Sequence, residues 1–176
     1  MTDRLFFALW PDESLRERLA TRLPALVTGV RGKPQRPDQW HVTLEFLGAV
    51  PADRRPAVRA AAIATRGEPF TVVFDLLEHW RRPHVYCLVA SATPAPLARF
   101  VSGLRAALFA EGFVPELRDY RPHVTLARKV RAAPGASLSE PIAWTADRFA
   151  LVRSVSDAAG SRYEPLDWWN LRGQGG

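Results

Sequence analysis

Cysteine is almost absent from this chain of 176 residues, in which Cys87 is the single thiol. An internal disulfide is therefore excluded, and the composition is typical of a reducing compartment. Cys87 lies in the apolar run 85–89, where we expect a buried strand residue. No apolar stretch reaches the length of a membrane span, and the first residues lack the layout of a signal peptide. We therefore expect a cytoplasmic protein with no membrane partner.

Lysine is also scarce, with Lys33 and Lys129 among 24 basic residues, yet the net charge is +6. A positive balance favours polyanionic partners, because phosphate contacts supply most non-specific affinity for nucleic acid. A solvated basic surface without a partner is the alternative. Hydrophobic residues at 47% and charged residues at 24% are ordinary for a globular protein. We expect one domain over residues 1–172, a monomer, with a flexible tail at 173–176.

Histidine occurs four times, and two of these residues open the same tetrapeptide, His-Val-Thr-Leu, at 41–44 and 123–126. If each copy is a β-strand, alternation places its His and Thr on one face and its Val and Leu on the other. An imidazole beside a hydroxyl, present twice, suits acid-base chemistry on a phosphate. One copy alone would be ordinary half-buried strand sequence. Strand propensity does not explain why histidine leads both copies.

The order of predicted elements repeats along the chain. A strand at 4–10, a helix from residue 11 and the first motif strand are followed by a helix at 52–65 and a strand at 70–77. A strand at 84–90, a helix at 96–111 and the second motif strand then repeat the first series, before a final hairpin at 149–155 and 162–166. The two motifs lie 82 residues apart, and the preceding strands about 79. This spacing predicts a duplicated fold with a pseudo-twofold axis.

Several segments together carry a family resemblance. These are the opening residues 4–9, the segments 40–48 and 121–128 around the two motifs, and Ser154, Tyr163 and Leu166 near the end. With these residues the chain resembles the two-histidine (2H) phosphoesterases, and within them the RNA 2′,3′-cyclic phosphodiesterases also called 2′-5′ RNA ligases. The resemblance implies an α+β, bilobal fold in which two antiparallel sheets flank a central cleft, with helices on the outside. It implies no metal and no other cofactor.

The resemblance also implies roles for individual residues. His41 corresponds to the proton donor to the leaving group, and His123 to the proton acceptor that activates water. Thr43 and Thr125 correspond to hydroxyls that hold phosphate oxygens, and Arg128 to a basic residue that binds substrate. The expected reaction opens a terminal 2′,3′-cyclic phosphate of RNA, such as a tRNA fragment or an oligonucleotide, to a 2′-phosphate. Further candidate substrate contacts are Arg36, Arg121 and Tyr120, which shortly precede the two motifs.

Three alternatives remain open at this point. The histidines at 41, 79, 84 and 123 could converge on a metal, although no metal-ligand spacing is present and we expect His79 and His84 to be exposed loop residues. A non-catalytic module could bind RNA ends, although binding alone gains little from groups that titrate near pH 7. A 2′-5′ RNA ligase would run the reverse chemistry with the same residues. The sequence contains no P-loop, which disfavours an ATP-driven ligase.

Overall fold

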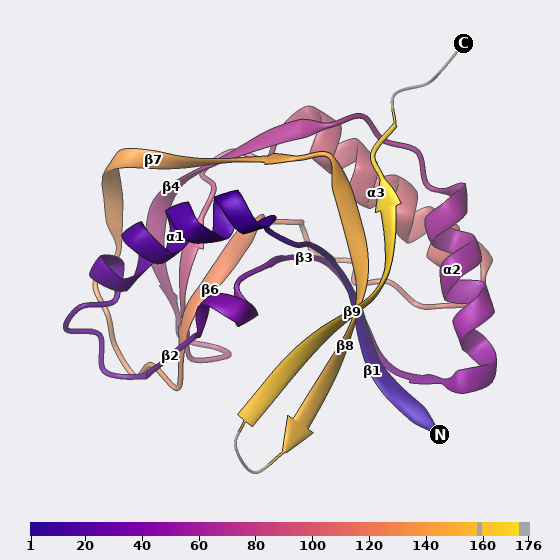
Figure 1. Cartoon of the computed structure of the whole chain (residues 1–176), viewed down its shortest axis with the longest axis horizontal. Helices are drawn as coiled ribbons and strands as arrows, with labels where there is room; N and C mark the ends of the chain where they lie inside the picture. The colour runs from indigo at the N-terminus through magenta and orange to yellow at the C-terminus, as the bar shows by residue number, and fades with distance from the viewer. Residues whose placement is uncertain (158–159, 173–176) are drawn as a thin grey trace.

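The fold is α+β and follows the predicted order of elements in a computed structural model that describes residues 1–157 and 160–172 (Figure 1). The helices are α1 (Glu13–Leu26), α2 (Arg55–Ala64) and α3 (Ala95–Ala110), with 3-10 turns η1 (Pro37–Gln39) and η2 (Ala52–Arg54). The strands are β1 (Thr2–Leu9), β2 (Lys33–Pro34), β3 (Val42–Pro51), β4 (Phe70–Trp80), β5 (Val85–Val89), β6 (His123–Arg128), β7 (Ala136–Ala146), β8 (Arg148–Asp157) and β9 (Gly160–Asn170).

The two expected antiparallel sheets meet edge to edge. The strand order is β7-β4-β5-β6-β3-β1-β8-β9, with β2 paired to the outer end of β6. Between β6 and β3 a single residue pair, Val42 with Val124, joins the two halves. Each half of the sheet therefore has four strands in this order, β3-β1-β8-β9 and β6-β5-β4-β7 from the seam outward, with β2 added on β6. The seam falls inside the two His-Val-Thr-Leu motifs.

Cross-strand register confirms that the halves are duplicates. In the first half Ala8 pairs with Thr43, and in the second Cys87 pairs with Thr125. A register irregularity precedes both pairs at the same place, between Phe7 and Ala8 and between Tyr86 and Cys87. The equivalent strand positions are 79 residues apart and the equivalent motif positions 82, as the sequence spacing predicts.

Each long helix packs against the half of the sheet that does not contain the strand preceding it. Helix α1 lies beside β7, where the Arg18 guanidinium donates to the Ala143 carbonyl at 3.1 Å (Figure 1). Helix α3 packs against the sheet of the first half, where the Phe100 ring meets that of Phe149 on β8 at 4.9 Å. The main core lies between these helices and the sheet. The opposite face of the sheet carries two small apolar clusters, one in each half.

Most predicted elements are confirmed, and Cys87 is buried within β5 as expected. The sequence reasoning missed β2 and β7. It was also wrong about His79, which lies in β4 with its Nε2 3.0 Å from the carbonyl of Val130. No helix in residues 1–157 and 160–172 is long and apolar enough to cross a membrane. The predicted tail at 173–176 and part of the predicted hairpin turn lie outside the described residues.

Trp144 on β7 tests whether this missed strand belongs to the core. Its side chain is 2% exposed and its ring centroid lies 6.3 Å from that of Phe74. We expect Trp144→Ala to lower the free energy of unfolding by about 3–5 kcal/mol, because it leaves a large cavity. Val73→Ala on the neighbouring strand, where the side chain is 47% exposed, is the control and should change little. Urea denaturation measures both, and equal small effects would contradict this packing.

Candidate functional site

A hollow of about 570 Å³ opens on the face of the sheet away from the main core. Both sides of the seam line it, since His41 and Thr43 lie on the first half and Arg128 closes it from the second. Its remaining lining residues come from β1, β3, β8 and β9 and are Arg4, Phe6, Phe46, Ser154, Ser156, Ser161 and Tyr163. The lining is thus cationic, hydroxyl-rich and aromatic, which suits a phosphate that carries an organic group.

The His41 ring is oriented by its own backbone. Its Nδ1 lies 2.7 Å from the carbonyl oxygen of Gln39, two residues earlier. A carbonyl can only accept, so Nδ1 carries the proton and Nε2 of the neutral ring is left as an acceptor on the opposite side. Gln39 is itself fixed, because its side-chain oxygen accepts from the backbone N–H of Arg36 at 3.0 Å. The turn η1 therefore sets both the tautomer and the direction of this ring.

The His123 ring is held in the same way. Its Nδ1 lies 2.9 Å from the carbonyl oxygen of Arg121, again two residues earlier. The proline between histidine and arginine keeps this approach extended. Both motifs thus present an imidazole whose Nε2 is turned away from its own backbone. Because Val42 and Val124 pair and are fully buried, the histidines and threonines that flank them share the opposite face of the sheet.

Aromatic rings pack against both imidazoles, though unequally. Trp10 stacks on His41, with ring centroids 5.6 Å apart and planes 14° apart. Phe6 and Tyr163 add contacts to the same ring at 4.9 and 5.0 Å. Within the described part of the chain His123 has one aromatic neighbour, Trp80, with ring centroids 4.5 Å apart. His41 is therefore the more enclosed of the two rings.

Burial and positive charge lower the pKa of both histidines. Desolvation is the main cause at His41, whose pKa falls to about 4, and the charges of His123 and Arg128 lower it further. Desolvation also lowers the pKa of His123, with added repulsion from Arg118, Arg121 and Arg128. Both rings are therefore neutral near pH 7 in the free protein. A bound anion would favour their protonated forms.

Arg128 spans from the second half of the sheet to the first. Its guanidinium donates to the Tyr163 hydroxyl at 3.4 Å and to the Gln35 side-chain oxygen at 3.3 Å. Tyr163 in turn packs edge-on against the His41 ring. Thr43 and Thr125 are both half-buried beside the seam. The structure thus gathers His41, Thr43 and Arg128 in the hollow, with His123 and Thr125 across the seam.

Three predicted substrate contacts lie outside the lining of the hollow. The Arg36 guanidinium pairs with the Asp38 carboxylate at 2.9 Å. Arg121 pairs with Glu78 at 2.8 Å while its guanidinium covers the Trp80 ring. Tyr120 donates its hydroxyl to the carbonyl of Thr43 at 3.0 Å, and burial raises the pKa of the phenol. Direct contact with substrate therefore stays a prediction for all three.

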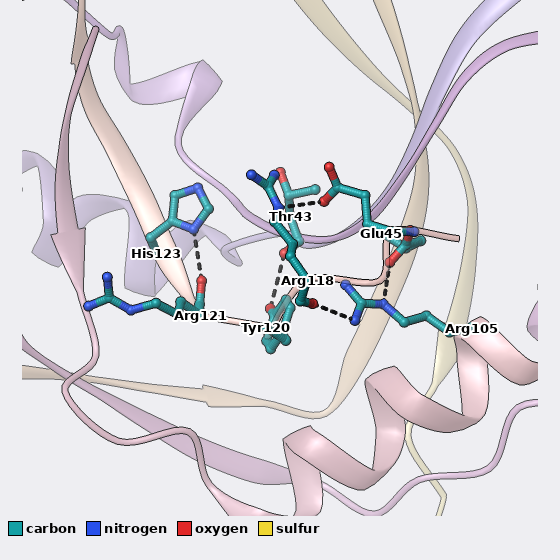
Figure 2. A network of polar contacts seen from close by, with 8 residues as sticks. Thr43, Glu45, Arg105, Arg118, Tyr120, Arg121 and His123 are labelled. Carbon is teal, nitrogen blue, oxygen red and sulfur yellow. Dashed lines mark hydrogen bonds and ion pairs between the residues drawn. The ribbon is translucent and has the colours of Figure 1, made fainter. Parts of the chain in front are cut away.

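A polar network ties the segment before the second motif to the strand of the first motif (Figure 2). Glu45, 2% exposed, accepts from the Arg105 guanidinium at 2.6 Å and from the backbone N–H of Glu116 at 2.8 Å. Arg105 also donates to the carbonyl of Arg118 at 3.1 Å. With Tyr120 on Thr43, these bonds fix the two motifs relative to each other.

Sequence reasoning missed several residues of the site. Arg4 and Phe6 on β1 and Ser156 on β8 line the hollow. Strand β1 is apolar on both faces near its end, so alternation gives no signal there. Trp10 and Trp80 reach the histidines from segments distant in sequence, which no local pattern reveals. Tyr163 and Ser154 were noted only as features of the resemblance. They face each other across β8 and β9 and both line the hollow.

A duplicated α+β fold that sets two His-x-Thr motifs on one face of a seam is the arrangement of the two-histidine phosphoesterases. The sequence model of the LigT-like phosphoesterases matches residues 9–87 and, a second time, residues 88–163. The chain therefore belongs to the LigT-like phosphoesterase family. Each match contributes strands to both halves of the sheet, since β4 falls in the first match and β8 in the second.

Relatives with named activities align over nearly the whole chain. The RNA 2′,3′-cyclic phosphodiesterase of Escherichia coli is 31% identical, over 96% of this chain and 96% of its own. That of Thermus thermophilus is 33% identical, over 98% of this chain and 92% of its own. The crystal structure of E. coli LigT complexed with 3′-AMP has a TM-score of 0.84 at 28% identity, covering 97% of this chain and 99% of that one.

Titration of His41 should make stability depend on pH. Its pKa is about 4 in the folded protein against 6.5 as the ordinary value, so the unfolded chain binds the extra proton between these limits. This contribution to stability is complete above pH 6.5 and is lost as the pH falls toward 4. We expect the urea midpoint of His41→Gln to fall less between pH 7 and pH 4.5 than that of wild type. His84→Asn, at an exposed turn, is the control, and equal falls in all three proteins would refute the assigned pKa.

Proposed function

We propose that this protein hydrolyses the terminal 2′,3′-cyclic phosphate of RNA to a 2′-phosphate. The observation that carries the proposal is the matched anchoring of His41 and His123, each with Nδ1 on a carbonyl two residues earlier and Nε2 left for another partner. Two such imidazoles beside a hollow lined by hydroxyls and arginine suit a phosphodiester that needs one proton removed and one supplied. The named activity of the bacterial relatives supports the same reaction.

The proton balance uses one histidine on each side of the phosphorus. His123 Nε2 takes a proton from water as the water oxygen bonds to phosphorus. The bond from phosphorus to the ribose 3′ oxygen breaks, and protonated His41 donates from Nε2 to that oxygen. The product keeps its phosphate on the 2′ oxygen, and the two rings end with their protonation states exchanged. This direction of opening follows the resemblance to the RNA 2′,3′-cyclic phosphodiesterases.

The donor role of His41 requires bound substrate, because its pKa of about 4 leaves the free ring neutral near pH 7. Enclosure by Trp10, Phe6 and Tyr163 is the surrounding that removes water from this ring. The negative phosphate supplies the charge that lets the ring hold a proton in the complex, because opposite charge favours the ionised form. His123 is enclosed by fewer rings and serves as the base.

Charge on the phosphate oxygens would be held by the remaining site residues. The hydroxyls of Thr43 and Thr125 flank the seam on the same face as the histidines. Arg128 can donate two parallel N–H groups to two phosphate oxygens. These hydrogen bonds strengthen as negative charge develops on the oxygens in the transition state. Arg121 and Tyr120 also orient His123 and Thr43, through the Arg121 carbonyl and the Tyr120 hydroxyl. The substrate is an RNA end, and the protein acts as a cytoplasmic monomer.

Hydrolysis of a nucleoside 2′,3′-cyclic phosphate in EDTA tests the proposal. We expect wild type to yield the 2′-phosphate, and His41→Ala and His123→Ala each to lower kcat by about 10²–10⁴-fold, because each removes one proton transfer. His84→Asn, at an exposed turn with a left-handed backbone that asparagine tolerates, should keep wild-type kcat. A product with a 3′-phosphate would contradict the assigned leaving group. Activity lost to EDTA, or kept by either alanine variant, would contradict the two-histidine mechanism.

A further inference from the structure

Arg118 lies in the segment between α3 and the second motif, and no part of the proposed reaction uses it. Its side chain is 76% exposed and pairs with the Glu116 carboxylate at 2.8 Å, which is itself 47% exposed. Exposed pairs of this kind contribute about 0–1 kcal/mol, so a phosphate can displace the carboxylate at little cost. Arg118 is therefore a cation available to an anionic ligand.

The backbone that carries Arg118 is firmly anchored although its side chain is exposed. The buried carboxylate of Glu45 accepts from the N–H of Glu116 at 2.8 Å, and Arg105 donates to the carbonyl of Arg118 itself at 3.1 Å. Tyr120 adds the third anchor through the carbonyl of Thr43 at 3.0 Å. Figure 2 shows the Arg118 side chain extending from this segment above the Thr43 strand. The Glu45–Arg105 pair thus presents a guanidinium at a fixed place beside the motifs.

The placement of Arg118 complements that of Arg128. The charge of Arg118 acts on His123, at the start of β6. Arg128 ends the same strand five residues later, about 16 Å along it. Arg128 lines the hollow that contains His41, whereas Arg118 lies outside that lining. A phosphate held by Arg128 in the hollow therefore leaves Arg118 for a second phosphate.

We infer that Arg118 binds the phosphodiester that precedes the terminal nucleoside of the RNA substrate. The inference rests on the proposed function, because the cyclic phosphate must lie at the motifs for the preceding phosphate to reach this end of the site. Arg118 then selects for RNA ends over free cyclic mononucleotides, which lack a second phosphate. Glu45 and Arg105 are positioning residues for this contact.

Two substrates that share one terminal nucleoside test the inference: the nucleoside 2′,3′-cyclic phosphate, and the dinucleotide that ends in it. We expect Arg118→Gln to lower the ratio of kcat/KM for the dinucleotide to that for the mononucleotide roughly tenfold, mainly through KM, because a charge-assisted hydrogen bond is lost. Any change in the pKa of His123 affects both substrates and cancels in the ratio. Arg99→Gln is the matched control, since Arg99 is also an exposed arginine paired with one glutamate, Glu68 at 3.2 Å.

The positioning role of Glu45 is tested in the same ratio. Glu45→Gln should lower the dinucleotide-to-mononucleotide ratio of kcat/KM. Combined with Arg118→Gln it should lower this ratio no further, because both changes remove the same contact. If the Glu45→Gln variant does not fold, as thermal melting will show, Arg105→Lys replaces it. Additive effects of the two changes would overturn the positioning role.

The outcomes separate this inference from the proposed function. A wild type that hydrolyses neither substrate would overturn both. A wild type that hydrolyses the mononucleotide, with a ratio that Arg118→Gln leaves unchanged or Arg99→Gln lowers equally, would overturn the inference alone. Two results together support the inference. The ratio falls in Arg118→Gln but not in Arg99→Gln, and the KM for the dinucleotide rises more steeply with salt in wild type than in Arg118→Gln.

Discussion

The pairing of Val42 with Val124 is the constraint on which the site depends. This one pair joins two four-stranded halves, and both valines are fully buried on the core side of the sheet. Because the valines point into the core, the residues on either side of each valine point to the opposite face of the sheet. The side chains of both motif histidines and both motif threonines therefore share that face. The two long helices pack on opposite sides of the seam, because α1 contacts β7 in one half of the sheet and α3 contacts β8 in the other. Separation of the halves would dismantle the site.

Duplication supplies two nearly equivalent histidines, and their surroundings make them different. Both rings use Nδ1 for a carbonyl two residues earlier, which is a local consequence of the extended approach to each motif. Around His41 stand three aromatic rings, while His123 is flanked by Trp80 and by arginines of its own approach segment. A reaction that needs an acid on one side of phosphorus and a base on the other requires such a difference. The duplicated strands therefore place the two histidines, and the different side chains around each ring distinguish their chemical roles.

Much of this could be predicted from local pattern. The repeated tetrapeptide indicates the duplication and the shared face of its histidines and threonines, because alternation along a strand is a local property. Apolar spacing predicts the helices within a few residues of their bounds. The rings on His41 and the anchors of Arg118 could not be predicted, since they depend on strands and a helix brought together only in the fold. The carboxylate partners of Arg36 and Arg121, Asp38 and Glu78, also could not be predicted from the motifs. The strand β7 was missed because its sequence has few apolar residues at its start.

Nitrogen-15 NMR of the histidine rings tests the central claim most directly, because it reads the protonation of each ring nitrogen. With the free protein at pH 7, the account predicts that His41 and His123 are both neutral, protonated on Nδ1 and bare on Nε2. Addition of a nucleoside 2′,3′-cyclic phosphate to the His123→Ala variant, which lacks the base, should protonate Nε2 of His41. Either ring with its proton on Nε2 in the free protein, or no response of His41 to the nucleotide, would contradict the account.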